Sequence, residues 1–207
     1  MTQVDHDKRR TLILECAFAL FAEKGFAGVT YQKIADRCGI SRTLIYKYFE
    51  NKEQIFDYAI KQGAGKLNAI IIKIMDRPDV SPVQKITRIL HTTSKMLSDN
   101  RVFLTVVLDF VFSQKLEGVD VRRKVRRHTY GMKFLLNRLL IDADKAGELH
   151  VPDPDTAASH LYGMLESFVL NLTVTDVLDW KDTVALIDAY IDLHKNNESR
   201  NEAGTPA

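Results

Sequence analysis

Cysteine, proline and long apolar runs are all scarce in this sequence, and each scarcity excludes a class of protein. The only cysteines are Cys16 and Cys38, and a lone pair in a chain without an export signal favours two reduced thiols over a disulfide. No apolar run reaches the roughly 18 residues that a membrane-spanning helix needs. The N-terminal sequence MTQVDHDKRR contains acids and has no apolar core, which argues against a secretory signal, so we expect a cytoplasmic protein.

Motifs of enzyme active sites are also missing from the sequence. It contains no Gly-rich phosphate-binding loop, no His-x-x-x-His pair and no nucleophile elbow. His91, His128, His150 and His160 are scattered without the spacing that metal ligands show. We therefore expect a protein that is not an enzyme and that needs neither a cofactor nor a metal.

The pattern that remains is helical almost throughout. Prolines occur only at positions 78, 82, 152, 154 and 206, no segment alternates like a strand, and no internal repeat is visible. The sequence therefore predicts an all-α fold. The expected helices span residues 8–24, 31–38, 42–49, 52–76 (as one or two helices), 82–98, 101–114, 119–146, 155–176 and 180–196.

Charge is distributed unevenly, although the formal net charge is only +2. Residues 1–52 carry nine Lys or Arg against six Asp or Glu, and residues 53–152 carry seventeen against eleven. Residues 153–207 carry three against ten, so the C-terminal quarter is acidic. The basic part is suited to an anion, but a block of charge alone, such as VRRKVRRH at 121–128, is more often a solvated helix face.

Short helices with clear start and stop signals follow one another near the N-terminus. Gly25 ends the first predicted helix, Thr30 is the N-cap of the second, and Gly39 ends the second. Ser41 and Asn51 are the predicted N-caps of the third and fourth helices. A helix, a glycine-containing turn and a short capped helix are typical of a helix-turn-helix unit.

The third predicted helix has two faces when its residues are placed at intervals of about 100° around the axis. The apolar face, which is expected to pack on the first helix, consists of Leu44, Ile45, Tyr48 and Phe49. The projecting face consists of Arg42, Thr43, Tyr46 and Lys47. Arginine and lysine donate to guanine in the major groove, and hydroxyl groups donate to phosphates, so the projecting face is suited to DNA.

Two further features favour the same surface. The N-terminal ends of the second and fourth helices, at Thr30 and Lys52, offer backbone N–H groups that attract phosphates. An alternative is that the tyrosines are half-buried core residues with lysines beside them. That alternative suits any one residue, but it leaves the projecting Tyr46 unexplained.

Residues 8–57 resemble the DNA-binding domain of TetR-type (tetracycline-repressor-like) transcriptional regulators. The resemblance rests on LFAEKGFAGVTYQKIADRCGIS followed by IYKYFENKEQIF, with the Phe-x-x-x-Gly-Phe, Gly-Ile-Ser and Tyr-x-Tyr-Phe-x-x-Lys-Glu elements in order. It implies a homodimer that binds a palindromic operator in double-stranded DNA, with the third helix in the major groove. The DNA contacts that it implies are Thr30, Tyr31, Ser41, Arg42, Thr43, Tyr46, Lys47, Tyr48 and Lys52.

One departure from the family pattern lies in the third helix. The family often has Gly-Thr-Leu where this chain has Thr43, Leu44 and Ile45. A small residue there allows close approach to DNA, so Thr43 is expected to shift the docking or to read a base itself. Leu44 lacks the hydroxyl group of the usual threonine.

The resemblance also implies three parts of the chain: a DNA-binding domain at 1–55, a helical ligand-binding and dimerisation domain at 56–197, and a disordered tail at 198–207. The last two helices would form the dimer interface. A dimer is expected because one DNA-binding domain alone contacts too few base pairs for useful specificity. The alternative is that their apolar faces pack within one subunit. The expected interface consists of Ala158, Leu161, Leu165, Phe168, Leu172, Val184, Ile187 and Ile191.

The expected effector is a small, largely apolar molecule. The segment RVFLTVVLDFVFSQ is apolar nearly all round, which predicts a buried helix that contains Asp109. A buried carboxylate either pairs with a base such as Arg138 or meets a cationic ligand, and Glu166 presents the same two options. The candidate pocket residues, each of which could instead be plain core, are Phe103, Val107, Asp109, Phe110, Tyr130, Phe134, Tyr162, Met164 and Glu166.

These observations predict a ligand-responsive transcriptional regulator. The expected mode of action is repression by a homodimer that an effector releases from a palindromic operator. The alternative is a helical protein-interaction module without sequence-specific DNA binding.

Overall fold

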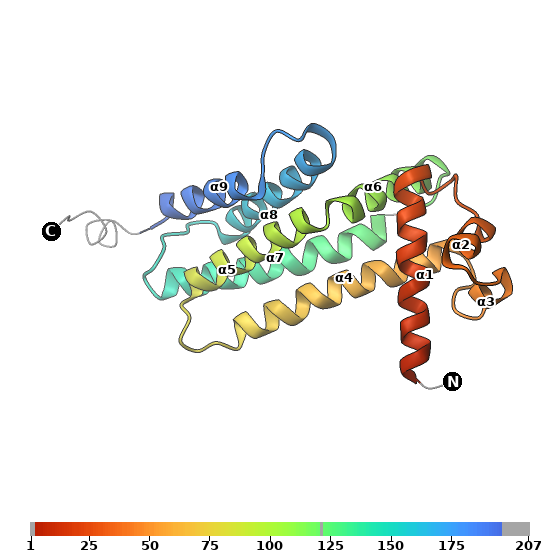
Figure 1. Ribbon diagram of the computed structural model, residues 1–207. Coiled ribbons are helices and arrows are strands. Elements are labelled where there is room, and N and C mark those ends of the chain that lie inside the picture. The colour runs from red at the N-terminus through yellow and green to blue at the C-terminus, as the bar shows by residue number, and fades with distance from the viewer. Residues whose placement is uncertain (1–2, 121, 196–207) are drawn as a thin grey trace. The chain divides into compact units, whose positions relative to one another are not determined.

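The computed structural model describes residues 3–120 and 122–195, and every regular element within them is a helix (Figure 1). The predicted all-α fold is confirmed, and the segment expected to form one or two helices over 52–76 is one helix, Lys52–Met75. The predicted tail at 198–207 lies outside the described residues. The elements are α1 (Gln3–Lys24), α2 (Tyr31–Cys38), α3 (Arg42–Tyr46), α4 (Lys52–Met75), α5 (Pro82–Asp99), α6 (Arg101–Leu116), α7 (Arg122–Lys145), α8 (Pro154–Leu170), a π-helical turn η1 (Asn171–Thr175) and α9 (Trp180–Leu193).

The ends of α2 and α3 follow from the capping residues that the sequence predicts. Thr30 Oγ1 accepts a hydrogen bond from Lys33 N at 3.3 Å, and Ser41 Oγ accepts one from Leu44 N at 3.2 Å. Gly39 has a left-handed backbone with φ of 64°, which ends α2 and which glycine adopts without strain. The turn between α2 and α3 is therefore determined by local chemistry.

The described residues divide into two compact units: residues 3–66 with 102–120, and residues 67–101 with 122–195. None of the helices in the described ranges is long and apolar enough to cross a membrane.

The first unit has one aromatic core to which α1, α2, α3, α4 and α6 contribute. Phe56 of α4 stacks on Phe110 of α6 with ring centroids 4.1 Å apart, and Phe18 of α1 stacks on Phe103 of α6 at 5.1 Å. A helix from much later in the chain thus completes the core of the helix-turn-helix unit. Burying such rings stabilises the unit through the apolar area that is removed from water.

The structure corrects one expectation about α6. The sequence predicts burial on all sides, but only Val106 and Phe110 of this helix are buried, whereas Val102, Phe112 and Leu116 are exposed. The reason is that one face of α6 packs on the first core and the other faces do not.

The second unit has an aliphatic core formed by α5, α7, α8 and α9. The start of α5 is fixed by a carboxylate from the loop after α7, because Glu148 Oε2 accepts from Ser81 Oγ at 2.9 Å and from Val83 N at 3.0 Å. His91 Nε2 of α5 and Asp188 Oδ1 of α9 lie 2.8 Å apart, within hydrogen-bond distance, and this contact joins the two helices. The basic run at 121–128 lies outside the residues whose side chains are described.

Candidate nucleic-acid interface

Helix α3 presents one polar and one apolar face, as its sequence predicts. Ile45 is fully buried and Phe49, just beyond the helix, is buried with it. Four polar residues on the opposite side are exposed: Arg42, Thr43 and Tyr46 of α3, and Lys47, which follows at its C-terminal cap.

Tyr46 is supported from two sides although 46% of its surface is exposed. Arg42 Nη2 donates a hydrogen bond to the hydroxyl oxygen of Tyr46 at 3.0 Å. The ring of Tyr46 meets the ring of Tyr31 edge to face, with centroids 4.8 Å apart. The exposed ring is therefore held in place by α2 as well as by its own helix.

Two of the predicted DNA contacts, Tyr31 and Tyr48, lie in the core, and each is only 7% exposed. The hydroxyl group of Tyr31 donates to the carbonyl oxygen of Phe49 at 3.0 Å, and burial raises the pKa of Tyr31 above its ordinary value. The ring of Tyr48 packs against the ring of His6 in α1, with centroids 4.6 Å apart. In this position the two tyrosines support α3, because most of each side chain is covered by protein.

Thr30 and Ser41 are exposed at the N-terminal ends of α2 and α3, where their hydroxyl groups cap the helices. Lys52 is turned toward the protein: its Nζ donates to the carbonyl oxygen of Phe26 at 3.0 Å and lies 4.5 Å from the centroid of that ring. The side chains of the predicted set therefore differ in role: Thr30 and Ser41 cap helices, Lys52 binds within the protein, and the exposed side chains of α3 and its C-cap are left open for a ligand.

Arg10 is a supporting residue that the sequence analysis did not single out. Its guanidinium carbon lies 4.8 Å from the ring centroid of Tyr58 and 5.7 Å from that of Phe49. It thereby joins α1 to α4 and to the segment just after α3. No signal in the sequence identifies it, because the three residues are far apart in the chain.

The two cysteines lie within the same unit and are free thiols. Burial, together with the neighbouring Cys16, raises the pKa of Cys38 to about 12. A thiol with so high a pKa is protonated at neutral pH and is a poor nucleophile.

The candidate pocket residues are divided between the two units. Phe103, Val107 and Phe110 pack on the aromatic core of the first unit. Tyr162 and Met164 pack on the core of the second unit, while Tyr130, Phe134 and Glu166 are exposed.

Asp109 is exposed, so it needs neither of the two partners, a base such as Arg138 or a cationic ligand, that a buried carboxylate would require. Its Oδ2 accepts a hydrogen bond from the backbone N–H of Phe26 at 2.9 Å. The expectation of a buried carboxylate is wrong because the face of α6 that carries Asp109 is at the edge of the core.

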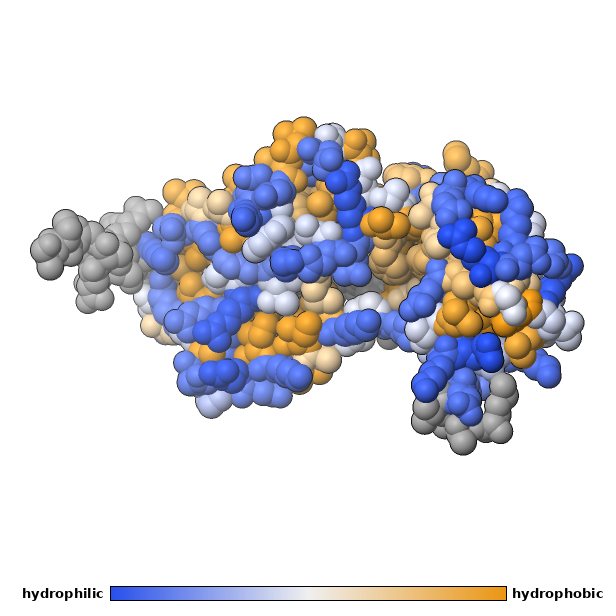
Figure 2. Space-filling view, in the orientation of Figure 1, coloured by the Kyte–Doolittle hydropathy of each residue, from blue (hydrophilic) through white to orange (hydrophobic). Residues whose placement is uncertain are grey.

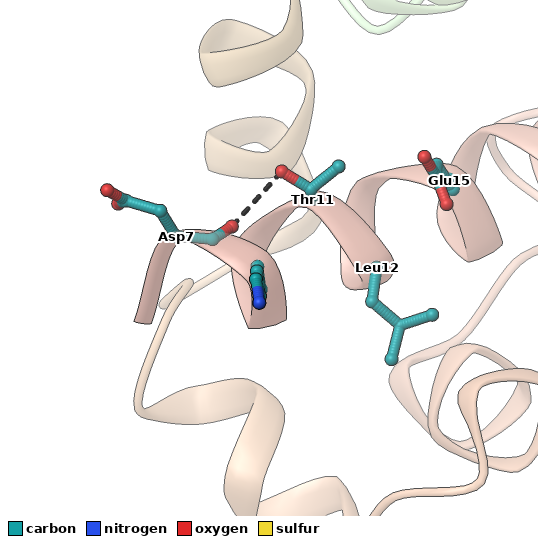
Figure 3. A pocket seen from close by; sticks show the side chains of 5 residues that line it. Asp7, Thr11, Leu12 and Glu15 are labelled. Carbon is teal, nitrogen blue, oxygen red and sulfur yellow. Dashed lines mark hydrogen bonds between the residues drawn. The ribbon is translucent and has the colours of Figure 1, made fainter. Parts of the chain in front are cut away.

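A hollow of about 430 Å³ lies along α1 and is lined by Asp7, Lys8, Thr11, Leu12 and Glu15 (Figure 3). Thr11 Oγ1 donates to the carbonyl oxygen of Asp7 across this face. None of the candidate pocket residues lines this hollow.

The expected dimer residues are largely buried within one chain. Seven of the eight lie in its interior, with Val184 as the partly exposed one; the seven are Ala158, Leu161, Leu165, Phe168, Leu172, Ile187 and Ile191. A side chain that is already buried in its own subunit has no surface to offer a partner, so these residues belong to the core. The same helices and their connection leave other apolar side chains exposed: Leu170, Val174, Val177, Leu186 and Leu193. Figure 2 shows hydrophobic surface over the connection between α8 and α9.

Two segments of the chain match known families. Residues 13–59 match the family described as bacterial regulatory proteins, tetR family. Residues 120–192 match the C-terminal domain of AefR-like transcriptional repressors. Together the two segments cover more than half of the chain.

Similar curated proteins are also transcriptional regulators. The chain is 26% identical over 152 residues to the uncharacterized regulator YerO of Bacillus subtilis, which covers 71% of this chain and 51% of YerO. It is 32% identical over 88 residues to PksA of the same organism, or 42% of each chain, so it spans about half or less of these two relatives. The fatty acid metabolism regulator protein of B. subtilis is 23% identical over 186 residues, which are 87% of this chain and 91% of that protein.

Solved structures with the same fold include regulators from an archaeon and a bacterium, Haloarcula marismortui and Mycobacterium tuberculosis. A TetR transcription regulator from Haloarcula marismortui has a TM-score of 0.74 at 15% identity and covers 92% of this chain and 100% of its own. The ketosteroid regulator KstR2 of Mycobacterium tuberculosis has a TM-score of 0.69 at 17% identity, with 91% and 96% covered. The matched segments and the shared fold agree: the chain is a member of the TetR family of transcriptional regulators.

Proposed function

We propose that this protein is a ligand-responsive transcriptional regulator that acts in the cytoplasm as a repressor. It binds a palindromic operator as a homodimer and is released by a small, largely apolar effector. The observation that carries the proposal is the exposed polar face of α3, which stands on the buried Ile45 and Phe49. A rigid helix with a guanidinium, an ammonium and two hydroxyl groups on one side has the donors that base edges and phosphates accept.

A protein-interaction module is the weaker alternative, because the projecting face of α3 has little apolar surface. Centres of protein interfaces are poor in charge and rich in buried aromatic anchors. Here the single aromatic of that face, Tyr46, is flanked by Arg42 and Lys47. This composition supports a polyanionic partner.

Exposed apolar residues of α8, η1 and α9 support a homodimer, although not through the residues that the sequence analysis expects. Leu186 and Leu193 are two turns apart on α9 and so share a face, and they are 52% and 72% exposed. Several exposed leucines and valines in one part of a fold favour an interface between copies. The DNA-binding domains of the two subunits, related by a two-fold axis, then contact the two half-sites of a palindrome.

Support for an apolar effector comes from the relatives. The fatty acid metabolism regulator of B. subtilis aligns over most of both chains, which makes fatty acids and their derivatives the first molecules to test. A ligand that binds only the folded state raises its melting temperature. We expect such a shift with lipophilic acids, and loss of operator binding at the same concentrations.

Selection from random duplexes at moderate salt tests the proposal. We expect one palindromic sequence to be enriched, with an affinity that falls linearly on a plot of log K against log salt. Tyr46→Ala is the matched control: it should enrich the palindrome much less than wild type does, while its dimer and its melting temperature are retained. Enrichment of no palindrome by the wild-type dimer would contradict operator binding and leave the interaction module as the better reading.

A further inference from the structure

The loop between α1 and α2, residues 25–29, is held from outside the helix-turn-helix unit at a single residue. Asp109 Oδ2 of α6 accepts from the N–H of Phe26 at 2.9 Å. Lys52 Nζ, at the start of α4, donates to the carbonyl oxygen of Phe26 at 3.0 Å. A carboxylate and an ammonium thus bind the two backbone groups of one residue, and hydrogen bonds to charged groups are the stronger kind.

The side chain of Phe26 is fixed as well. It is almost fully buried, and its ring meets Phe110 at 4.6 Å and Phe56 at 5.7 Å between centroids. The ammonium of Lys52 lies 4.5 Å from the centroid of the same ring. Phe26 is therefore held through its backbone and its side chain by α4 and α6 together.

The rest of the loop has little freedom. Gly28 has no room for a side chain, because a Cβ there would lie 2.4 Å from the carbonyl oxygen of Lys24. Lys33 Nζ donates to the carbonyl oxygen of Gly28 at 2.7 Å. A loop held at residues 26 and 28 delivers the chain to Thr30, the N-cap of α2, in one position.

The position of α2 in turn determines that of the recognition face. Tyr31, the first residue of α2, bonds the carbonyl oxygen of Phe49 and packs edge to face on Tyr46. The path from Asp109 to the exposed ring of Tyr46 thus runs through the hydrogen bond to Phe26, along the backbone to Tyr31, and through the ring contact of Tyr31 with Tyr46. A misplacement of the loop is expected to reach α3 along this path.

We infer that Asp109 and Lys52 are positioning residues for operator binding: they clamp Phe26 and so set α2 and the recognition face of α3 for DNA. This inference rests on the proposed function. It gives Asp109 a role in the DNA-binding unit instead of the effector pocket. It also gives the ammonium of Lys52 a partner in the protein, where the family resemblance implies a phosphate.

The sign of the effect at Asp109 separates positioning from simple electrostatics. Removing a negative charge from a DNA-binding unit is expected to strengthen its attraction to DNA or leave it unchanged. Removing a positioning contact is expected to weaken binding. Asp109→Ala should therefore bind the selected palindromic duplex about tenfold more weakly than wild type, the size expected for a hydrogen bond to a charged group.

Two variants provide the controls for this measurement. Asp109→Asn keeps an oxygen that can accept from the N–H of Phe26, so it should restore most of the affinity that Asp109→Ala loses. Glu117→Gln removes a carboxylate just beyond the end of α6, where Glu117 accepts from the side chain of Gln114, and should bind as tightly as wild type or more tightly. Affinities are compared on folded dimers well below their melting temperatures.

Lys52→Met tests the other side of the clamp by salt dependence. If Lys52 neutralises a phosphate, the slope of log K against log salt falls by about one. If Lys52 positions the loop, the affinity falls while the slope stays the same. This readout remains decisive even if Asp109→Ala does not fold.

The outcomes also separate this inference from the proposed function. If the wild-type dimer selects no palindrome, the proposed function fails first. If the wild type binds its palindrome and Asp109→Ala behaves like Glu117→Gln, the clamp is overturned while the proposed function stands. A slope reduced by about one in Lys52→Met overturns the assignment of Lys52 as a positioning residue.

Discussion

The guanidinium of Arg42 donates a hydrogen bond to the hydroxyl oxygen of Tyr46, one turn further along α3, at 3.0 Å. The same guanidinium carbon lies 5.6 Å from the centroid of the Tyr46 ring. Two exposed side chains thus hold each other before any ligand is bound. Side chains that are ordered in advance lose less entropy on binding, so this pair is expected to act as one unit.

We predict that Tyr46→Ala weakens operator binding by about tenfold or more, the range for loss of a good base contact. Tyr46→Phe should lose less, because the ring that packs on Tyr31 is retained. In a double-mutant cycle with Arg42→Ala the two losses should not add, since the side chains share a hydrogen bond. Titration of the selected duplex with each variant measures this; additive losses would show that the two residues act independently.

Phe110 of α6 should matter for the stability of the DNA-binding unit although it lies outside the motif. Phe110→Ala is expected to cost about 3–5 kcal/mol of unfolding free energy, because it removes a buried ring that stacks on Phe56. Phe112→Ala is the matched control: Phe112 is 59% exposed on the same helix, and its loss should change stability by about 0.5 kcal/mol or less. Denaturant unfolding of both variants tests the claim, and equal effects would contradict the core that α6 completes.

The exposed leucines of α9 should control association. Leu186→Glu combined with Leu193→Glu is expected to weaken dimerisation by about two orders of magnitude or more, because apolar anchors carry most of an interface energy. The monomer should keep its unfolding free energy. Leu165→Ala, in the core, should show the reverse: a dimer with about 2–5 kcal/mol less stability. Sedimentation with parallel unfolding distinguishes the two, and an intact dimer in the double variant would place the interface elsewhere.

The buried hydroxyl of Tyr31 predicts a loss of stability in alkali. Burial raises the pKa of Tyr31 above its ordinary value of 10.0, so the folded state holds this proton more tightly than the unfolded state does. The resulting stabilisation is complete below about pH 10 and is lost as the pH rises above it. At pH 8 the unfolding free energy of Tyr31→Phe should be about 1 kcal/mol below that of wild type, because the carbonyl of Phe49 loses its donor. Above that pH it should fall less steeply than the unfolding free energy of wild type. Unfolding free energies of both proteins from pH 8 upward test this, and parallel curves would contradict it.

Local signals in the sequence were sufficient for the order of the helices and for the two faces of α3, although the third helix ends at Tyr46 and not near Phe49. Thr30, Gly39 and Ser41 determine the ends of α2 and α3 through hydrogen bonds to groups a few residues away. Periodicity alone separates Ile45 from Tyr46, because neighbours in a helix point about 100° apart. Such features depend on short stretches of chain, and a single sequence contains them.

Features that depend on contacts between distant segments could not be predicted in the same way. The apolar pattern of α6 shows that it needs a partner, but not that the partner is the core around Phe26 and Phe56. Leu165 and Leu186 are equally apolar, and only the fold buries one and exposes the other. Asp109 reads as a costly buried charge in an apolar segment, yet it lies at an edge and binds a backbone N–H.

The most direct test of the central claim compares the wild-type dimer on two duplexes of equal length at the same salt. One is the selected palindrome and the other has one half-site scrambled. Since each mismatched base pair costs about 1–3 kcal/mol, we predict that the intact palindrome binds at least about a hundredfold more tightly, and that Tyr46→Ala removes most of this difference. Equal affinity of the wild-type dimer for the two duplexes would contradict the binding of a palindromic operator by this protein.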